Sequence, residues 1–224
     1  MDEVVESDNL MKVALEKATD LATMGHPAYS MTKELYIAET QKKIDDTINE
    51  LDSWWMNQFH HKIKNFPSSP SEEFLTKIFI LNQENTPEVG SLNSIEHLKQ
   101  LIQLSSYQFY VIKEDEIIGF TICFKENSSY DSLNYKFFSD TESKFIYIDR
   151  IAIKDSFRRK GIGKSFYNYI EQIVIEEKIP LCCEVNTIPL NQPSMQFHKK
   201  LGFKQVGQES FNDHTVAYFI KKNK

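Results

Sequence analysis

The sequence predicts an α/β (α+β) fold, with a mixed central sheet flanked by helices and a helical hairpin preceding it. Short apolar runs of strand character alternate with helical stripes between about residues 75 and 221, whereas the first 66 residues show helical spacing alone. A run with two prolines and three serines, 66–71, separates these regions and is a poor continuation of any helix. We therefore expect a helical N-terminal extension at 1–66 and a main domain at 72–224.

The N-terminal extension contains two segments with helical spacing. The first runs from about 4 to 24 and is broken by Gly25-His26-Pro27, and the second runs from about 31 to 64. The second segment carries apolar residues at intervals of 4, 3 and 4, which is a short heptad seam formed by Ile44, Ile48, Leu51 and Trp55. Three partners for this seam remain open: the first helix, the main domain, or a second copy of the chain in a homodimer.

The main domain shows strand and helix patterns in alternation. A run with apolar residues on both faces, 145–153, is typical of a central strand, and the polar stretch 125–143 is long enough to favour a functional role. The other expected elements are a strand at 77–81, one or two helices within 86–104, a hairpin of strands 108–112 and 117–124, a helix at 163–178, a strand at 181–185, a helix at 193–201, and closing strands at 204–211 and 215–221.

Composition excludes several classes of function. A net charge of −6 argues against a nucleic-acid-binding protein, and no apolar run approaches the length of a membrane span. The cysteine count is odd, and the neighbours Cys182 and Cys183 must point to opposite faces of their strand, so we expect no disulfides and a cytoplasmic location. His60-His61 lacks further ligands at metal-binding spacing, so no metal is expected.

A basic, glycine-containing run lies between the central strand and the next helix. It comprises Arg158, Arg159, Lys160, Gly161, Ile162, Gly163 and Lys164. The first N–H groups of a helix are free to bind an anion, and glycine lets the backbone approach it closely. The run therefore predicts a phosphate site, whereas the six residues Arg158 to Gly163 in isolation would more often form a solvated surface turn.

Two further landmarks lie on either side of this run. Ile151-Ala152-Ile153 precedes it, and Asn191, Ser194 and 197–203 (Phe-His-Lys-Lys-Leu-Gly-Phe) follow it. Together with the run, they resemble the GNAT acetyltransferase superfamily over residues 75–221. Ile148-Asp149-Arg150, Glu184-Val185-Asn186 and Pro189 suggest a branch of predicted acetyltransferases.

The resemblance implies a GNAT-like sheet and acetyl-CoA as co-substrate. The backbone of Ile151, Ala152 and Ile153 would pair with the pantetheine arm. N–H groups from Arg159 to Gly163 would hold the pyrophosphate. Asn191, with Ser194 beside it, would touch the coenzyme or brace the strand–helix junction.

Transfer from a thioester to an amine requires a deprotonated amine, a polarised carbonyl group and a stabilised or protonated thiolate. The resemblance implies direct transfer, so Cys182 and Cys183 are interpreted as core residues. Where the family has a tyrosine acid this chain has His198, which could donate a proton, act as a neutral hydrogen-bonding group, or simply belong to the core. Asp149 and Glu184 are candidate bases; an ion pair of Asp149 with Arg150, or a water as base, is the alternative.

The polar stretch before the central strand supplies candidate acceptor contacts, Tyr130, Ser132 and Asn134, although an ordered surface excursion would explain it too. His214 in the last turn is expected to face solvent or approach the acceptor. We expect an acyltransferase that moves an acetyl group from acetyl-CoA to a small-molecule or peptide amine. The alternative is an acyl-CoA-sensing module whose helical extension binds a partner or dimerises.

Overall fold

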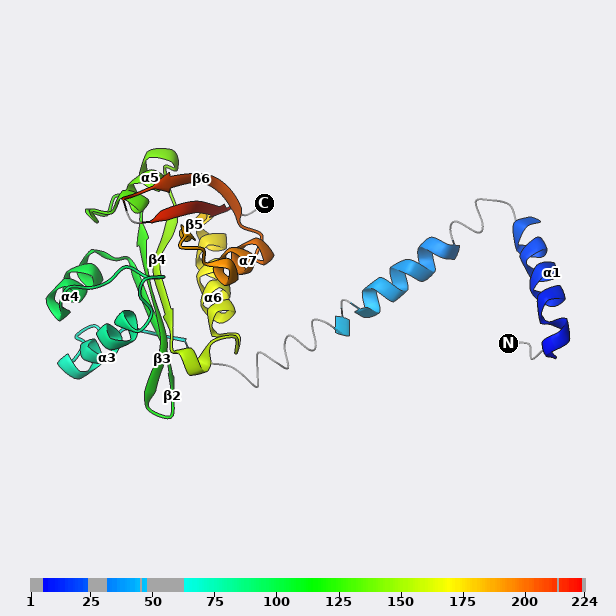
Figure 1. Ribbon diagram of the computed structural model, residues 1–224, viewed down its shortest axis with the longest axis horizontal. Helices are drawn as coiled ribbons and strands as arrows, with labels where there is room; N and C mark the ends of the chain where they lie inside the picture. The colour runs from blue at the N-terminus through cyan, green and yellow to red at the C-terminus, as the bar shows by residue number, and fades with distance from the viewer. Residues whose placement is uncertain (1–5, 24–31, 45, 48–62, 213, 223–224) are drawn as a thin grey trace. The chain divides into compact units, whose positions relative to one another are not determined.

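The computed structural model describes residues 6–23, 32–44, 46–47, 63–212 and 214–222 (Figure 1). The chain divides into two compact units, residues 1–60 and 61–224. Each unit is described by itself.

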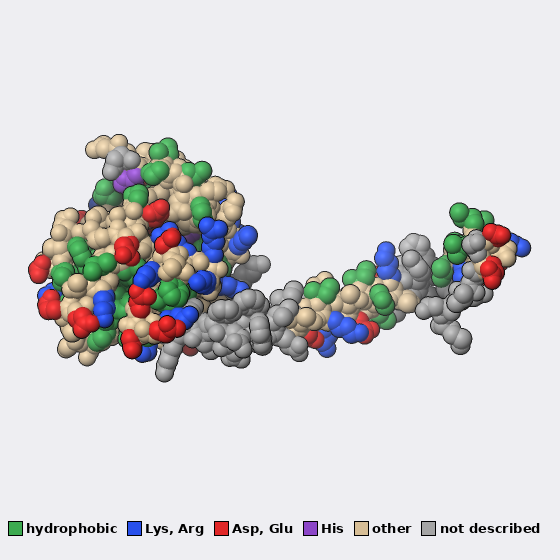
Figure 2. Space-filling model, turned by 60° about the horizontal axis from the view of Figure 1, so that its bottom comes forward, with side chains coloured by type: hydrophobic (Ala, Val, Ile, Leu, Met, Phe, Trp, Pro, Cys, Tyr) green, Lys and Arg blue, Asp and Glu red, His purple; other side chains and the backbone are tan. Residues whose placement is uncertain are grey.

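The N-terminal unit is helical where it is described. It contains a 3₁₀ turn, Ser7–Asn9, the helix α1 (Leu10–Thr23) and helical residues at 32–44 and 46–47. None of the residues of α1 is buried, and hydrophobic side chains are exposed along these helices (Figure 2). The predicted helices are thus present, but their pairing as a hairpin and any homodimer remain predictions. Across the described residues, no helix has the length and apolar content needed to cross a membrane.

Part of the predicted heptad seam, Ile48, Leu51 and Trp55, lies outside the described residues, and so does the His60-His61 pair. The predicted second helix is wrong at its end, because Ile63–Asn65 forms the edge strand β1. Phe66, at the start of the predicted linker, is buried against Phe74 and Tyr110.

The second unit is built on a seven-stranded mixed sheet in the order β1-β2-β3-β4-β5-β7-β6 (Figure 1). Among the described strands, β4 and β5 form the one parallel pair. The other strands are β2 (Tyr107–Lys113), β3 (Glu116–Lys125), β4 (Ile146–Ile153), β5 (Leu181–Ile188), β6 (Lys204–Ser210) and β7 (Thr215–Lys221). The predicted mixed sheet is confirmed, and β4 is central as its two apolar faces indicated.

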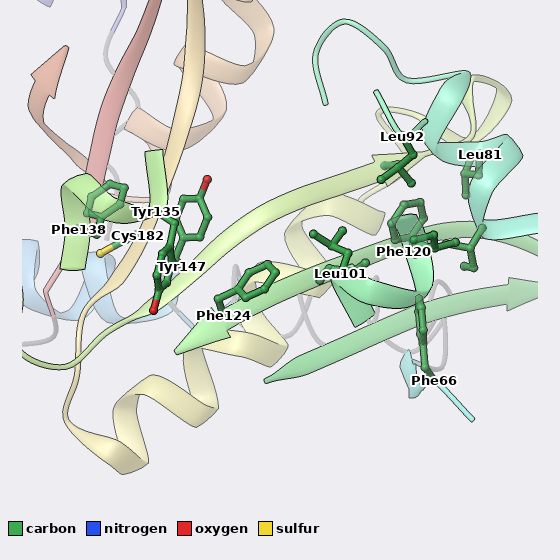
Figure 3. Close-up of a cluster of buried hydrophobic side chains, with 14 of the residues drawn as sticks. Phe66, Leu81, Leu92, Leu101, Phe120, Phe124, Tyr135, Phe138, Tyr147 and Cys182 are labelled. Atoms are coloured by element: carbon green, nitrogen blue, oxygen red, sulfur yellow. The ribbon is translucent and has the colours of Figure 1, made fainter. Parts of the chain in front are cut away.

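Helices cover both faces of the sheet. The first face packs against α3 (Glu72–Gln83), α4 (Ile95–Leu104) and α5 (Leu133–Thr141), and the second against α6 (Ile162–Glu177) and α7 (Gln192–Lys200) (Figure 1). Alternation along the strands divides the core, so that Tyr147 and Cys182 belong to the first face and Ile148 and Cys183 to the second. Figure 3 shows the first-face core, with Tyr135, Phe138 and Tyr147 near one end and Leu81, Leu92 and Phe120 near the other.

One prediction in the first half of this unit was wrong, and the structure adds detail to two others. Residues 77–81 belong to α3 rather than to a strand, because Leu75, Ile78 and Leu81 recur every three residues on one buried face and Ser71 caps the first turn. The prediction of one or two helices within 86–104 is confirmed by α4, which begins at Ile95, after Thr86-Pro87 and Gly90. The polar stretch 125–143 contains α5.

The remaining elements agree with the predictions to within a few residues. The hairpin of β2 and β3 turns at Glu114 and Asp115, both with positive φ. The central strand, the helix after the basic run, the next strand, the short helix before Gly202 and the two closing strands are all present.

Candidate active site

The parallel strands β4 and β5 pair along only part of their length. Their register ends at Ile148 and Cys183, although β4 continues to Ile153 and β5 to Ile188. Beyond this last pair lies a pocket of about 550 Å³ lined by both strands. In this described part of the chain, the facing edges of the two strands share no further ladder, so an extended ligand can bind between them as an added strand.

The pocket brings together sequence-predicted residues from several elements. They are Tyr130, Ser132, Asn134, Asp149, Ile151, Glu184, Asn191, Ser194 and His198. His214 also lines it, with its ring stacked on Phe211. Ala152, Ile153 and 158–164 do not line the pocket. A loop that the sequence analysis did not assign to the site, 85–91, forms another wall.

A β-bulge places Asp149 at the point where the strands separate. The register of β3 against β4 joins Ile122 to Arg150 and Cys123 to Ile148, so Asp149 is the extra residue. Neighbouring side chains of a regular strand point to opposite faces, but here Arg150 Nε donates to Asp149 Oδ2 at 2.7 Å. Both side chains are only 5% exposed, which establishes the ion pair that was the alternative interpretation of Asp149.

The predicted acceptor contacts are held in place by hydrogen bonds on the first face. Tyr130 stacks on Phe124 and donates its hydroxyl hydrogen to Asp149 Oδ1 at 2.7 Å. Burial, and then the charge of Asp149, raise the pKa of Tyr130. Ser132 caps α5, and Asn134 Oδ1 accepts a hydrogen bond from Tyr218 at 3.0 Å.

Glu184 presents an unsatisfied carboxyl oxygen on the same face. Burial, followed by the charge of Asp149, raises the pKa of Glu184 to about 8. Tyr147 and Asn134 lie close enough to offset part of this rise, although no hydrogen bond of normal geometry reaches Glu184 Oε2 or the Tyr147 hydroxyl. A carboxyl group with this pKa is mostly protonated at neutral pH, which is a common property of functional acids and bases.

His198 lies on the second face, with both ring nitrogens engaged. Its Nδ1 lies 2.7 Å from the carbonyl oxygen of Ser194, which can only accept, so Nδ1 carries the hydrogen. Its Nε2 lies 2.6 Å from Tyr167 Oη and accepts the hydroxyl hydrogen. Burial lowers the pKa of His198, and the hydrogen bond to Ser194 opposes this. The ring is thus a neutral hydrogen-bonding group in this structure, and a catalytic part for it stays a prediction.

Sequence reasoning missed Tyr167. This residue lies on α6, four positions after Gly163, and lines the pocket. Its spacing from Gly163 puts it on the same helix face, which was the available signal. Nothing in the sequence shows that its hydroxyl group meets His198, 31 positions further along the chain.

The basic run, residues 158–164, leads into the start of α6, and we name it the anion cradle after the role predicted for it. Arg159 and Gly161 both have positive φ, and α6 begins at Ile162 with no side-chain cap. The first N–H groups of this helix are therefore available to an anion. A side chain at Gly161 would have open space around it, but the positive φ of this residue would strain its backbone. A side chain at Gly163 would contact Phe197 and Ile153.

Some of the residues predicted to contact the coenzyme form hydrogen bonds with other residues of the protein. Asn85 Oδ1 accepts hydrogen bonds from the N–H of Ile153 at 3.3 Å and from Arg158 Nη2 at 2.9 Å. Asn191 caps α7 by accepting from the N–H of Ser194, and its own N–H donates to the carbonyl of Asn186. Asn191 thus braces the strand–helix junction, which was one of its two predicted roles.

Comparisons with known proteins agree with this architecture. The sequence model of the acetyltransferase (GNAT) family matches residues 73–203, more than half of the chain. NAA60 of Arabidopsis thaliana, in complex with a bisubstrate analogue, is similar with a TM-score of 0.55 and 14% identity, covering 71% of this chain and 96% of that one. The ribosomal-protein-S18-alanine N-acetyltransferase of Escherichia coli is similar with a TM-score of 0.53 and 12% identity, covering 72% and 92%.

An aminoglycoside 6'-N-acetyltransferase complexed with coenzyme A is also similar, with a TM-score of 0.54 and 16% identity, covering 71% of this chain and 96% of that chain. At these identities the solved structures establish the fold alone. The family match runs from α3 to α7 and includes strands β2 to β5, the basic run and the separated ends of β4 and β5. The chain belongs to the acetyltransferase (GNAT) family.

Proposed function

We propose that this protein transfers an acetyl group from acetyl-CoA to an amine by direct transfer in a ternary complex. One observation carries the proposal: β4 separates from β5 beside the uncapped start of α6. This arrangement suits a ligand that carries phosphates at one end and an extended, amide-containing arm at the other. Acetyl-CoA is such a ligand, and its thioester supplies the acetyl group.

The backbone of β4 can receive the pantetheine arm on one edge. The N–H of Lys154 donates to the carbonyl of Ile118 on β3, so by alternation the N–H groups of Ile151 and Ile153 point away from β3, toward the gap. Ile151 lines the pocket. Since the N–H of Ile153 is bonded to Asn85, the arm must displace that side chain or stop before it.

The anion cradle would hold the pyrophosphate through the N–H groups at 159–163. The basic side chains of Arg159, Lys160 and Lys164 add positive charge around it. Arg158 is the less direct contact, because its guanidinium group donates to Asn85.

The acceptor amine would enter from the first face, where Tyr130, Ser132 and Asn134 line the pocket. Glu184 is the better of the two carboxyl groups to contact it, because Oε2 has no partner within the described structure, whereas Asp149 is held by Arg150 and Tyr130. The related structures include enzymes for a ribosomal protein and for an aminoglycoside, and both kinds of acceptor are amines.

The test is thiol release from acetyl-CoA measured against a panel of amines, from amino sugars and polyamines to peptides. We expect turnover with at least one amine class and micromolar to millimolar binding of coenzyme A by calorimetry. Tight coenzyme binding without turnover on any amine would favour the sensing module instead. Absence of both binding and turnover would refute the proposal.

A further inference from the structure

Tyr167 and His198 form a buried pair at the inner end of the pocket. Both line the pocket together with Ile148 and Cys183, the last residues that pair between β4 and β5. The distance of 2.6 Å between Tyr167 Oη and His198 Nε2 makes this a short hydrogen bond. The phosphate and acceptor contacts proposed above make no use of it.

The tautomer of His198 decides what this pair presents to a bound molecule. Because Nδ1 gives its hydrogen to the carbonyl of Ser194, Nε2 must accept the hydroxyl hydrogen of Tyr167. The hydroxyl oxygen of Tyr167 keeps its other lone pair, and the Cys183 thiol group lies within hydrogen-bonding reach of this hydroxyl group on the pocket side. At rest the pair offers a hydrogen-bond acceptor, and so a base, rather than a donor.

The thioester would reach this pair from the anion cradle. Tyr167 lies about one helical turn beyond Gly163, on the same face of α6. An arm that starts at the cradle and follows β4 inward ends where strand pairing begins, at Ile148 and Cys183. This is the position at which Tyr167 lines the pocket.

We propose that Tyr167 and His198 form a proton relay for the acetyl transfer described above, on which this inference rests. As the amine nitrogen bonds to the thioester carbon, its proton passes to Tyr167 Oη, and the hydroxyl proton of Tyr167 passes to His198 Nε2. When the C–S bond breaks, its electron pair stays on sulfur. His198 then returns its proton to Tyr167, and Tyr167 gives one to sulfur. The amide and the thiol leave neutral, and both side chains regain their starting state.

The surroundings of His198 support a brief uptake of a proton. Nδ1 donates to the Ser194 carbonyl in the neutral and in the charged ring alike, so the ring need not move. The rings of Phe197, Phe203 and Phe219 pack around it. Burial lowers the pKa of His198, which favours return of the proton to the product.

The carboxyl groups are poorer bases near neutral pH. Glu184, with a pKa of about 8, already carries a proton there, and Asp149 is bound in the ion pair with Arg150. The titratable groups that act on Tyr167 are the thiols of Cys183 and Cys123 and, through its charge alone, Glu184; burial raises the pKa of Cys183. The pKa of Glu184 is raised and that of His198 is lowered. Opposite pKa shifts of two groups in one site commonly separate the acid from the base.

Two substitutions test the relay by kinetics. Tyr167→Phe removes the hydroxyl group, and His198→Gln keeps an acceptor for it but no basic nitrogen. We expect each to lower kcat by about 10²-fold or more while coenzyme A affinity stays unchanged. Tyr169→Phe, the same change at a half-exposed tyrosine of α6 that lies outside the pocket lining, is the matched control and should keep wild-type kcat. If His198 only positioned Tyr167, the glutamine variant would turn over near the wild-type rate.

A second measurement does not depend on turnover. Nitrogen-15 NMR of His198 in the full-length protein at pH 7.5 should show hydrogen on Nδ1 and none on Nε2. Hydrogen on Nε2 would overturn the relay whatever the kinetics, because Tyr167 would then be a donor to the pocket. If the wild type turns over and either Tyr167→Phe or His198→Gln does so at a similar rate, the relay is refuted but acetyl transfer is not. Failure of the wild type with every amine would instead refute acetyl transfer, and the relay with it.

Discussion

Replacement of Glu184 by glutamine should stabilise the protein more strongly as the pH rises. Glu184 has a folded-state pKa of about 8 against an ordinary value of 4.5, because burial disfavours its charged form. The folded state therefore binds more protons than the unfolded chain between these two values. Stability must fall as the pH rises through this window, with no penalty below about 4.5 and a constant penalty above about 8.

The magnitude follows from the size of the shift. At about 1.36 kcal/mol for each pKa unit, the penalty is up to about 5 kcal/mol at pH 8 to 9, and about 3 kcal/mol at pH 7. Glu184→Gln keeps the shape and removes the titration. The variant should match the wild type near pH 4.5 and exceed its free energy of unfolding by several kcal/mol at pH 9, an upper bound that relaxation around the charged side chain reduces.

The assay is urea unfolding followed by far-ultraviolet circular dichroism at pH 5, 7 and 9. Glu177→Gln is the control, and its expected change in stability has the opposite sign. A hydrogen bond from Lys125 lowers the pKa of Glu177, so this variant should lose stability at neutral pH. A difference between Glu184→Gln and the wild type that does not change with pH would refute the reasoning.

Three further substitutions test the site. Gly161→Val should raise the KM for acetyl-CoA about tenfold or more in thiol-release assays, because a β-branched residue at a φ of +84° distorts the anion cradle; an unchanged KM would contradict the cradle. Asp149→Asn should destabilise the protein by about 3–5 kcal/mol in urea titrations, because it leaves the buried Arg150 charge uncompensated; a neutral effect would contradict the buried ion pair. His198→Phe should lower turnover about tenfold or more with unchanged coenzyme A affinity by calorimetry; normal turnover would exclude a catalytic part for His198.

The sequence predicted the second half of the main domain well, for identifiable reasons. The strand at 145–153 is apolar on both faces, and 163–178 and 193–201 follow glycine or proline signals with clear helical spacing. The strand expected at 77–81 failed because a run of five apolar-rich residues is equally compatible with a helix, and the buried positions Leu75 and Ile78 show a spacing of three only when the run is extended backward.

The chemistry of the site was less accessible from the sequence, because it depends on tertiary contacts. The ion pair of Asp149 with Arg150 stayed one of two interpretations, because it forms at a bulge that the sequence does not mark. The partnership of Tyr167 with His198 joins two helices, and among the alternatives open from the sequence it favours a neutral, hydrogen-bonding His198. Asn85 illustrates the same point, since its bonds to Ile153 and Arg158 connect an unassigned loop to the cradle.

The central claim is that the gap between β4 and β5 receives the pantetheine arm, and amide hydrogen exchange at Ile151 tests it most directly. The N–H of this residue points into the gap and has no counterpart on β5 in the described ladder. Saturating coenzyme A should slow exchange at Ile151 markedly while β6 exchanges at an unchanged rate. Coenzyme A binding without added protection at Ile151 would contradict the account.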